Sequence, residues 1–94
     1  MDSLAPNQVF EEVQAGRLRI LDLRTKAERK RYGAPARAEH VSLVRHVIHP
    51  EGPGTIYLCQ HAVRSKLTLR NGAAEVAGGF SAWRDAGLPI ETVD

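Results

Sequence analysis

The chain has 94 residues, of which 43% are hydrophobic and 26% are charged, and its formal net charge is +2. This length and composition are typical of one globular domain with a single core, so we expect one domain over residues 1–94. No apolar run approaches the ~20 residues that a membrane-spanning helix needs, and the acidic N-terminal segment lacks the basic start of a signal peptide. These features favour the cytoplasm and no membrane. The basic residues are scattered and no aromatic residues are interleaved among them, so nucleic-acid binding is not supported.

The first half of the chain alternates helical and extended patterns. A helix is predicted to begin at Pro6, which suits a first helical turn, and to end near Gly16. Residues 18–23 are predicted to form a mostly buried strand. A capping box at Thr25 predicts a short helix that ends at Gly33. Residues 40–48 are apolar and β-branched, which favours an extended segment.

The second half continues this alternation. Two prolines and two glycines in residues 49–54 predict a loop, and residues 55–59 a buried strand. A helix is predicted over 64–70, a short strand over 75–77 and a last helix over 80–86. Alternating strands and helices in a short chain indicate an α/β domain with a largely parallel central sheet and helices on its faces.

Cys59 is the only cysteine of the chain, and it closes the predicted strand at residues 55–59. In open parallel sheets, ligands bind at the carboxyl ends of the strands. The turn between Cys59 and the helix predicted from Arg64 is short, so backbone N–H groups and the helix dipole are expected to converge on one point. Such surroundings favour the thiolate, which attacks soft electrophiles such as sulfane sulfur. The alternative is a buried core cysteine, the commoner setting for a lone cysteine.

The segment Cys59–Ser65, with the sequence CQHAVRS, resembles the active-site loop of the rhodanese family, in which a cysteine and an arginine enclose four residues. Three further segments resemble rhodanese motifs in the same order along the chain. Residues 21–24 (LDLR) resemble the early strand motif, residues 38–43 (AEHVSL) a central motif, and residues 78–89 the C-terminal signature. Together these matches extend over about residues 18–90.

The resemblance implies a small rhodanese-like domain and a sulfurtransferase activity. Cys59 would carry sulfur as a persulfide, taken from thiosulfate or a protein persulfide and passed to a thiol, to another nucleophile or to a protein acceptor, without a cofactor. Six loop residues would bind the substrate: Gln60, His61, Ala62, Val63, Arg64 and Ser65. Asp22 and Arg24 would support this loop.

Several of these residues also have a plainer interpretation. Arg64 either closes the loop around its anion or forms a salt bridge to Asp22 or Glu28. Asp22 either accepts hydrogen bonds from loop amides or merely caps its strand. His61 either contacts the substrate or is an exposed loop histidine.

The chain departs from the family pattern at a few positions. Ala62 and Arg37 stand where the family usually has glycine, and Ser42 where it has proline. The connections 43–55 and 64–78 are shorter than usual, so at least one helix is predicted to be shortened or missing.

Other site chemistries receive less support. Cysteine phosphatases place five residues between cysteine and arginine, whereas four stand here, and a narrower loop suits sulfur better than phosphate. A small phosphatase or arsenate reductase is therefore the weaker alternative. A catalytically silent sulfur-carrier or interaction module is another alternative. No metal is expected, because nothing completes a ligand set around the histidines. Phe80 and Trp83 are predicted to be core anchors, and Gly78–Gly79 a tight turn.

Overall fold

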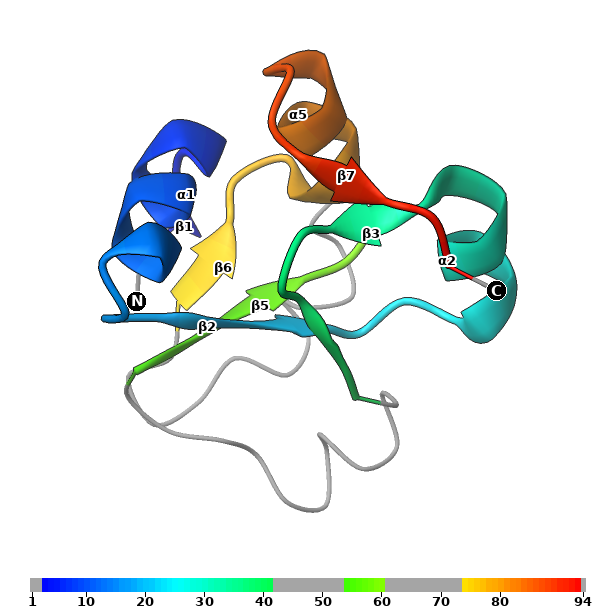
Figure 1. Cartoon of the computed structure of the whole chain (residues 1–94), viewed down its shortest axis with the longest axis horizontal. Coiled ribbons are helices and arrows are strands. Elements are labelled where there is room, and N and C mark those ends of the chain that lie inside the picture. The colour runs from blue at the N-terminus through cyan, green and yellow to red at the C-terminus, as the bar shows by residue number, and fades with distance from the viewer. Residues whose placement is uncertain (1–2, 42–53, 61–73, 94) are drawn as a thin grey trace.

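The structure is a computed structural model, which describes residues 3–41, 54–60 and 74–93 (Figure 1). Its elements, in chain order, are β1 (Ser3–Leu4), α1 (Pro6–Gln14), β2 (Arg19–Asp22), α2 (Lys26–Tyr32), β3 (Ala34–Pro35), β4 (Glu39–His40), β5 (Thr55–Leu58), β6 (Ala74–Val76), α5 (Gly79–Asp85) and β7 (Ile90–Glu91).

Five strands form one sheet in the order β1-β6-β5-β2-β4, and all neighbouring strands in it are parallel. At its centre β2 and β5 pair over four residues, from Arg19 opposite Thr55 to Asp22 opposite Leu58. The short strands β3 and β7 pair separately and antiparallel. The predicted α/β class with a largely parallel sheet is therefore confirmed.

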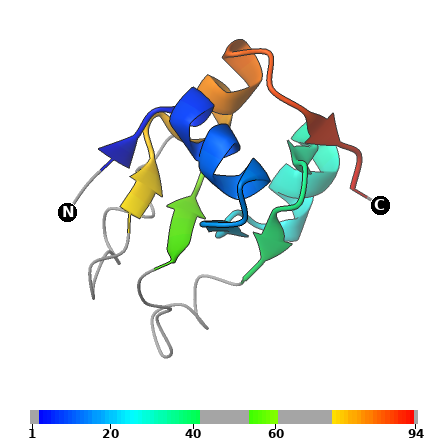
Figure 2. The same ribbon diagram turned by 60° about the vertical axis from the view of Figure 1, so that its left-hand side comes forward.

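The core lies on both faces of the central strands, because side chains alternate between the faces of a strand. One cluster joins the sheet to α1 and α5, which lie side by side in Figures 1 and 2. It consists of Val9, Val13, Ile20, Ile56, Leu58, Val76, Phe80 and Trp83. The opposite face carries a second cluster, which consists of Leu21, Leu23, Val41 and Tyr57. Strands buried on both faces read as continuous apolar runs, which is why β2 and β5 were predictable from the sequence.

The helix ends follow the predicted chemistry. The Thr25 hydroxyl accepts a hydrogen bond from the Glu28 amide (3.1 Å), and the Glu28 carboxylate accepts one from the Thr25 amide (2.9 Å), so the capping box is present. Gly78 caps the start of α5 and Gly79 is the first residue of the helix; their φ angles are 75° and 65°, which confirms the tight turn. Phe80 and Trp83 are buried as predicted.

Other predictions on the fold are refined or lie beyond the described residues. The two-residue strands β1, β3 and β7 were not expected. Of the extended segment predicted over 40–48, the structure describes only the first two residues. The loop residues 49–53, the helix predicted over 64–70 and the expected loss of a family helix lie outside the described ranges. Within those ranges no helix has the length and apolar character needed to cross a membrane.

Candidate active site

Cys59 and Gln60 directly follow β5, at the carboxyl end of the strand that lies between β2 and β6. Both are buried, with 1% of Cys59 and 8% of Gln60 exposed. The position at a strand end agrees with the sequence prediction. Burial by itself is compatible with a core cysteine and with a shielded nucleophile, so the distinction depends on the groups around this pair.

The main chain of this pair is held by the first turn of α5. The amide of Phe80 donates a hydrogen bond to the carbonyl oxygen of Cys59 (2.8 Å), and the amide of Ser81 donates one to that of Gln60 (3.1 Å). These amides belong to the first helical turn, whose N–H groups have no partner within the helix. This contact was not predicted from the sequence, although Gly78–Gly79 indicated a helix start directly before Phe80.

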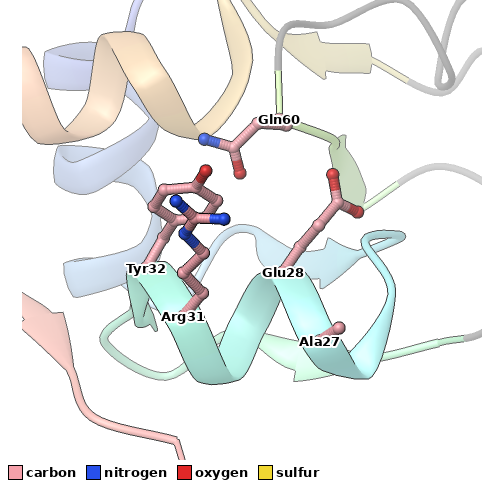
Figure 3. Close-up of a pocket in the computed structure, with 5 residues that line it drawn as sticks. All are labelled: Ala27, Glu28, Arg31, Tyr32 and Gln60. Carbon is pink, nitrogen blue, oxygen red and sulfur yellow. The ribbon is translucent and has the colours of Figure 1, made fainter.

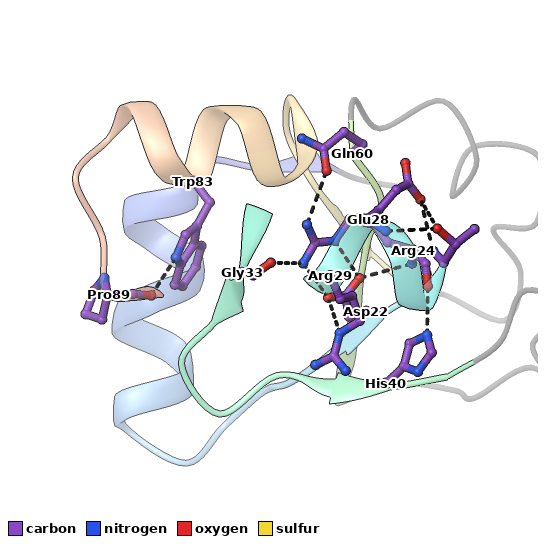
Figure 4. Close-up of polar contacts among 10 residues, drawn as sticks. Asp22, Arg24, Glu28, Arg29, Gly33, His40, Gln60, Trp83 and Pro89 are labelled. Atoms are coloured by element: carbon purple, nitrogen blue, oxygen red, sulfur yellow. Dashed lines mark hydrogen bonds and ion pairs between the residues drawn. The ribbon is translucent and has the colours of Figure 1, made fainter. Parts of the chain in front are cut away.

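A buried arginine holds the side chain of Gln60 (Figure 4). Arg24, 1% exposed, donates from Nη1 to the Gln60 amide oxygen (3.2 Å) and from Nη2 to the carbonyl oxygen of Gly33 (2.6 Å). Its guanidinium carbon lies 4.1 Å from the centroid of the Phe80 ring. Arg24 therefore links Gln60 to β2, to the end of α2 and to α5.

Asp22 is the counter-ion of this arginine. Its two carboxylate oxygens accept from Nε (3.0 Å) and Nη2 (2.8 Å) of Arg24, a bidentate pair, and Arg29 donates from Nε to the same carboxylate (3.0 Å). The Arg24 amide also donates to it (3.0 Å). One buried carboxylate thus faces two guanidinium groups, which leaves a local positive charge beside Gln60. Such an excess favours anionic species nearby.

An open pocket of about 340 Å³ lies between Gln60 and one side of α2 (Figure 3). Its described lining residues are Ala27, Glu28, Arg31, Tyr32 and Gln60. Ala27, Arg31 and Tyr32 were not predicted as site residues. The only available signal was the density of basic residues in the helix sequence KAERKRY.

The structure thus brings together four of the predicted site residues: Cys59, Gln60, Arg24 and Asp22. For Asp22 the described partners are Arg24 and Arg29. The amides of loop residues 61–65, the partners considered from the sequence, lie outside the described residues. His61, Ala62, Val63, Arg64 and Ser65 lie outside the described residues. Among the residues that are described, no group of three histidine, cysteine, aspartate or glutamate side chains is arranged as metal ligands.

No protein-family model and no curated protein sequence matches this chain. Solved structures do match it. A rhodanese-related protein from Thermoplasma volcanium is 21% identical with a TM-score of 0.74, and the match covers 97% of this chain and 98% of that one. A thiosulfate sulfurtransferase from Pseudomonas aeruginosa is 20% identical with a TM-score of 0.77, over 97% of this chain and 19% of that one.

A third similar structure carries a different name. A protein of unknown function from Rhodopseudomonas palustris, named as a possible tyrosine phosphatase, is 23% identical with a TM-score of 0.76 over 97% of this chain and 85% of that one. At these identities the matches establish the fold and not the activity. The chain has a rhodanese-like fold, as the sequence motifs predicted.

Proposed function

We propose that this protein is a sulfurtransferase that carries sulfane sulfur as a persulfide on Cys59. The observation that carries the proposal is the setting of Cys59 at the carboxyl end of a central parallel strand. There the Cys59 carbonyl oxygen accepts a hydrogen bond from the first turn of α5, and the Gln60 side-chain oxygen accepts one from Arg24. Parallel sheets bind their ligands at this edge. The sulfurtransferase among the similar structures supports the same chemistry.

The proposed reaction has two balanced steps. The Cys59 thiolate attacks the outer sulfur of thiosulfate or of a protein persulfide; a new S–S bond forms, the donor's own S–S bond breaks, and sulfite or the donor thiolate leaves with the electron pair. An acceptor thiolate, or a protein acceptor, then attacks the outer sulfur of the Cys59 persulfide, and the electron pair returns to Cys59 as thiolate. Sulfur supplies the redox chemistry, so no cofactor is required.

The other site residues have supporting roles in this proposal. His61, Ala62, Val63, Arg64 and Ser65 form the rest of the loop that holds the sulfur anion, with Arg64 closing it. Asp22 holds Arg24, which in turn holds Gln60. Arg24 and Arg29 share the single negative charge of Asp22, so this group has a net positive charge, which favours an anionic donor and an anionic persulfide. We place the reaction in the cytoplasm, where thiols are kept reduced.

A phosphatase is the second candidate, because one similar structure is named as a possible tyrosine phosphatase. The four residues between Cys59 and Arg64 argue against it, since a phosphate with three bound oxygens needs a wider ring of N–H donors. A catalytically silent module is the third. The sulfurtransferase, the phosphatase and the silent module can be distinguished by whether Cys59 gains sulfur and whether a phosphate ester is hydrolysed.

The test is to incubate the purified protein with thiosulfate and measure its intact mass and the sulfite released. We expect the wild type to gain the mass of one sulfur atom on Cys59 and to release sulfite in equal amount. Cys59→Ser should gain none while keeping its circular dichroism spectrum and melting temperature. A wild type that gains no sulfur from thiosulfate or from a persulfide donor would indicate the silent module. Hydrolysis of p-nitrophenyl phosphate that depends on Cys59 would indicate the phosphatase.

A further inference from the structure

Helix α2 concentrates positive charge beside the candidate site. Its seven residues include four basic side chains and one acidic one, so the helix carries a net charge of +3 in a chain whose net charge is +2. Two pockets flank it. The pocket beside Gln60 contains Arg31, whereas the second is lined by Lys26, Arg29, Lys30, His40 and Val93.

Arg31 is the basic residue among the described lining residues of the first pocket. Glu28, three residues earlier, would be its natural partner on the helix, but the Glu28 carboxylate accepts hydrogen bonds from Thr25. Arg29 is bonded to Asp22. Within the described part of the chain Arg31 makes no ion pair, and its guanidinium carbon lies 5.3 Å from the centroid of the exposed Tyr32 ring. No described residue accepts a hydrogen bond from its five N–H donors, so these donors can bind a ligand in the pocket.

The pocket joins this cation to the residue next to Cys59. Figure 3 shows the Arg31 guanidinium and the Tyr32 ring together on the side of α2 that faces the Gln60 amide, with the Glu28 carboxylate apart from them. Among the described residues, the pocket reaches the carboxyl end of β5 at Gln60, whose Cα is ~3.8 Å from that of Cys59. A volume of about 340 Å³ lies at the lower end of the range for ligand pockets, which favours a small molecule.

We propose that this pocket receives the sulfur acceptor and selects small thiols that carry a carboxylate, which pairs with the guanidinium of Arg31. The proposal rests on the sulfurtransferase function proposed above and adds the substrate class. A guanidinium matches a carboxylate with two parallel hydrogen bonds, whereas a neutral or cationic thiol gains nothing from it. The bound acceptor thiolate attacks the outer sulfur of the Cys59 persulfide and leaves as a persulfide, while Cys59 returns to thiolate.

The test measures acceptor selectivity in protein that has been loaded with sulfur. Second-order rates are recorded for mercaptopropionate, mercaptoethanol and cysteamine, which carry a negative, no and a positive charge. Comparing each variant with the wild type on the same thiol cancels the intrinsic reactivity of that thiol. Arg31→Gln is expected to lower the ratio of the mercaptopropionate rate to the mercaptoethanol rate ~10-fold, as for the loss of a charge-assisted hydrogen bond.

Lys30→Gln is the matched control. It removes the same charge from the neighbouring residue of the same helix, but Lys30 lines the other pocket. The selectivity ratio of this variant should stay within about twofold of the wild type, since an exposed charge outside the pocket is largely screened by salt. An equal loss in both variants would mean that the general field of α2 acts on the thiol, and an unchanged ratio in Arg31→Gln would mean that the pocket does not select; either result overturns the proposal.

A binding measurement separates this proposal from the proposed function. Methylthiopropionate resembles the acceptor but cannot react, and its titration can be followed by the NMR signals of the Gln60 side-chain amide. We expect saturable shifts in the wild type and in Lys30→Gln, and their loss in Arg31→Gln. Absence of shifts in the wild type overturns the acceptor pocket even where sulfur is transferred. Shifts in a protein that never gains sulfur overturn the sulfurtransferase function and leave the carboxylate site standing.

Discussion

Arg37 occupies a backbone position that normally selects glycine. The Ala38 amide donates to the carbonyl oxygen of Pro35 (3.1 Å), which closes a turn over residues 35–38, and Arg37 is its third residue with φ of 70°. A turn of this kind requires a positive φ at the third position, where glycine is favoured. The sequence motif indicated glycine here, and the structure keeps the glycine-like conformation with an exposed arginine in place.

Arg37→Gly is therefore expected to stabilise the protein. A left-handed conformation costs a non-glycine residue ~1–2 kcal/mol, while glycine costs ~0.5–1 kcal/mol in backbone entropy. The balance is a gain of ~0.5–1 kcal/mol in the free energy of unfolding, measured by urea denaturation. Arg37→Ala removes the same side chain but retains the strain, so it should stay within ~0.5 kcal/mol of the wild type. A glycine variant less stable than the alanine variant would contradict the strain argument.

Single residues also show how far the site was predictable from the sequence. Asp22 and Arg24 are two apart at the end of a strand, so their side chains share a face and their pairing was accessible to sequence reasoning. The position of Cys59 at a strand end was predicted from the apolar segment before it. The bond between Arg24 and Gln60 joins residues 36 positions apart, and no local pattern encodes it. The pocket beside α2 depends in the same way on how the helix packs near the end of β5.

At the scale of elements, local chemistry separated what could be predicted from what could not. The helices carry capping residues or flanking glycines. The strands β2 (RILD) and β5 (TIYL) are short, mostly buried segments with apolar residues at their centres, so each element was recognisable by itself. The strands β1, β3 and β7 have two residues each, too few for a periodic pattern. They exist because distant partners supply their hydrogen bonds: β6 for β1, and β7 for β3.

The turn before α5 connects an element boundary to the site. Gly78 has φ of 75°, and a Cβ added to it would lie 2.6 Å from the Cβ of Ala82, within the helix that holds the carbonyls of Cys59 and Gln60. Gly87, after the same helix, has φ of 72° but open space around it. The two glycines therefore share the conformational requirement and differ in steric contact.

Gly78→Ala is expected to destabilise the protein more than Gly87→Ala. Each pays ~1–2 kcal/mol for the left-handed conformation, and the clash at Gly78 adds ~1–3 kcal/mol. Thermal and urea unfolding of both variants measures the difference. The rate of sulfur loading on Cys59 should also fall in Gly78→Ala and not in Gly87→Ala. Adding Ala82→Gly to Gly78→Ala should recover part of the clash energy in a double-mutant cycle. Equal losses of stability in Gly78→Ala and Gly87→Ala would show that the helix shifts to relieve the clash.

At the scale of the whole molecule, Trp83 connects the described parts of the chain. It is the only tryptophan, is 1% exposed, and shares the larger core cluster with residues of α1, β2, β5 and β6. Its indole N–H donates to the carbonyl oxygen of Pro89 (2.9 Å), just before β7. The first and last thirds of the chain thus meet at one side chain.

A single domain should unfold in one transition, and Trp83 reports it. Because this ring is buried among four other elements, its fluorescence should change only when the core opens, while far-ultraviolet circular dichroism follows all helices, including α2 outside that cluster. Small domains usually unfold in a two-state manner, so we expect the two signals to give the same urea midpoint and slope. The control is Trp83→Phe, which keeps most of the ring volume. Its circular dichroism transition should be as cooperative as that of the wild type, with a somewhat lower urea midpoint. A circular dichroism transition that begins before the fluorescence change would mean that α2 and the β3–β7 pair melt on their own. The acceptor pocket would then belong to a separately stable part, and the chain would not be one cooperative domain.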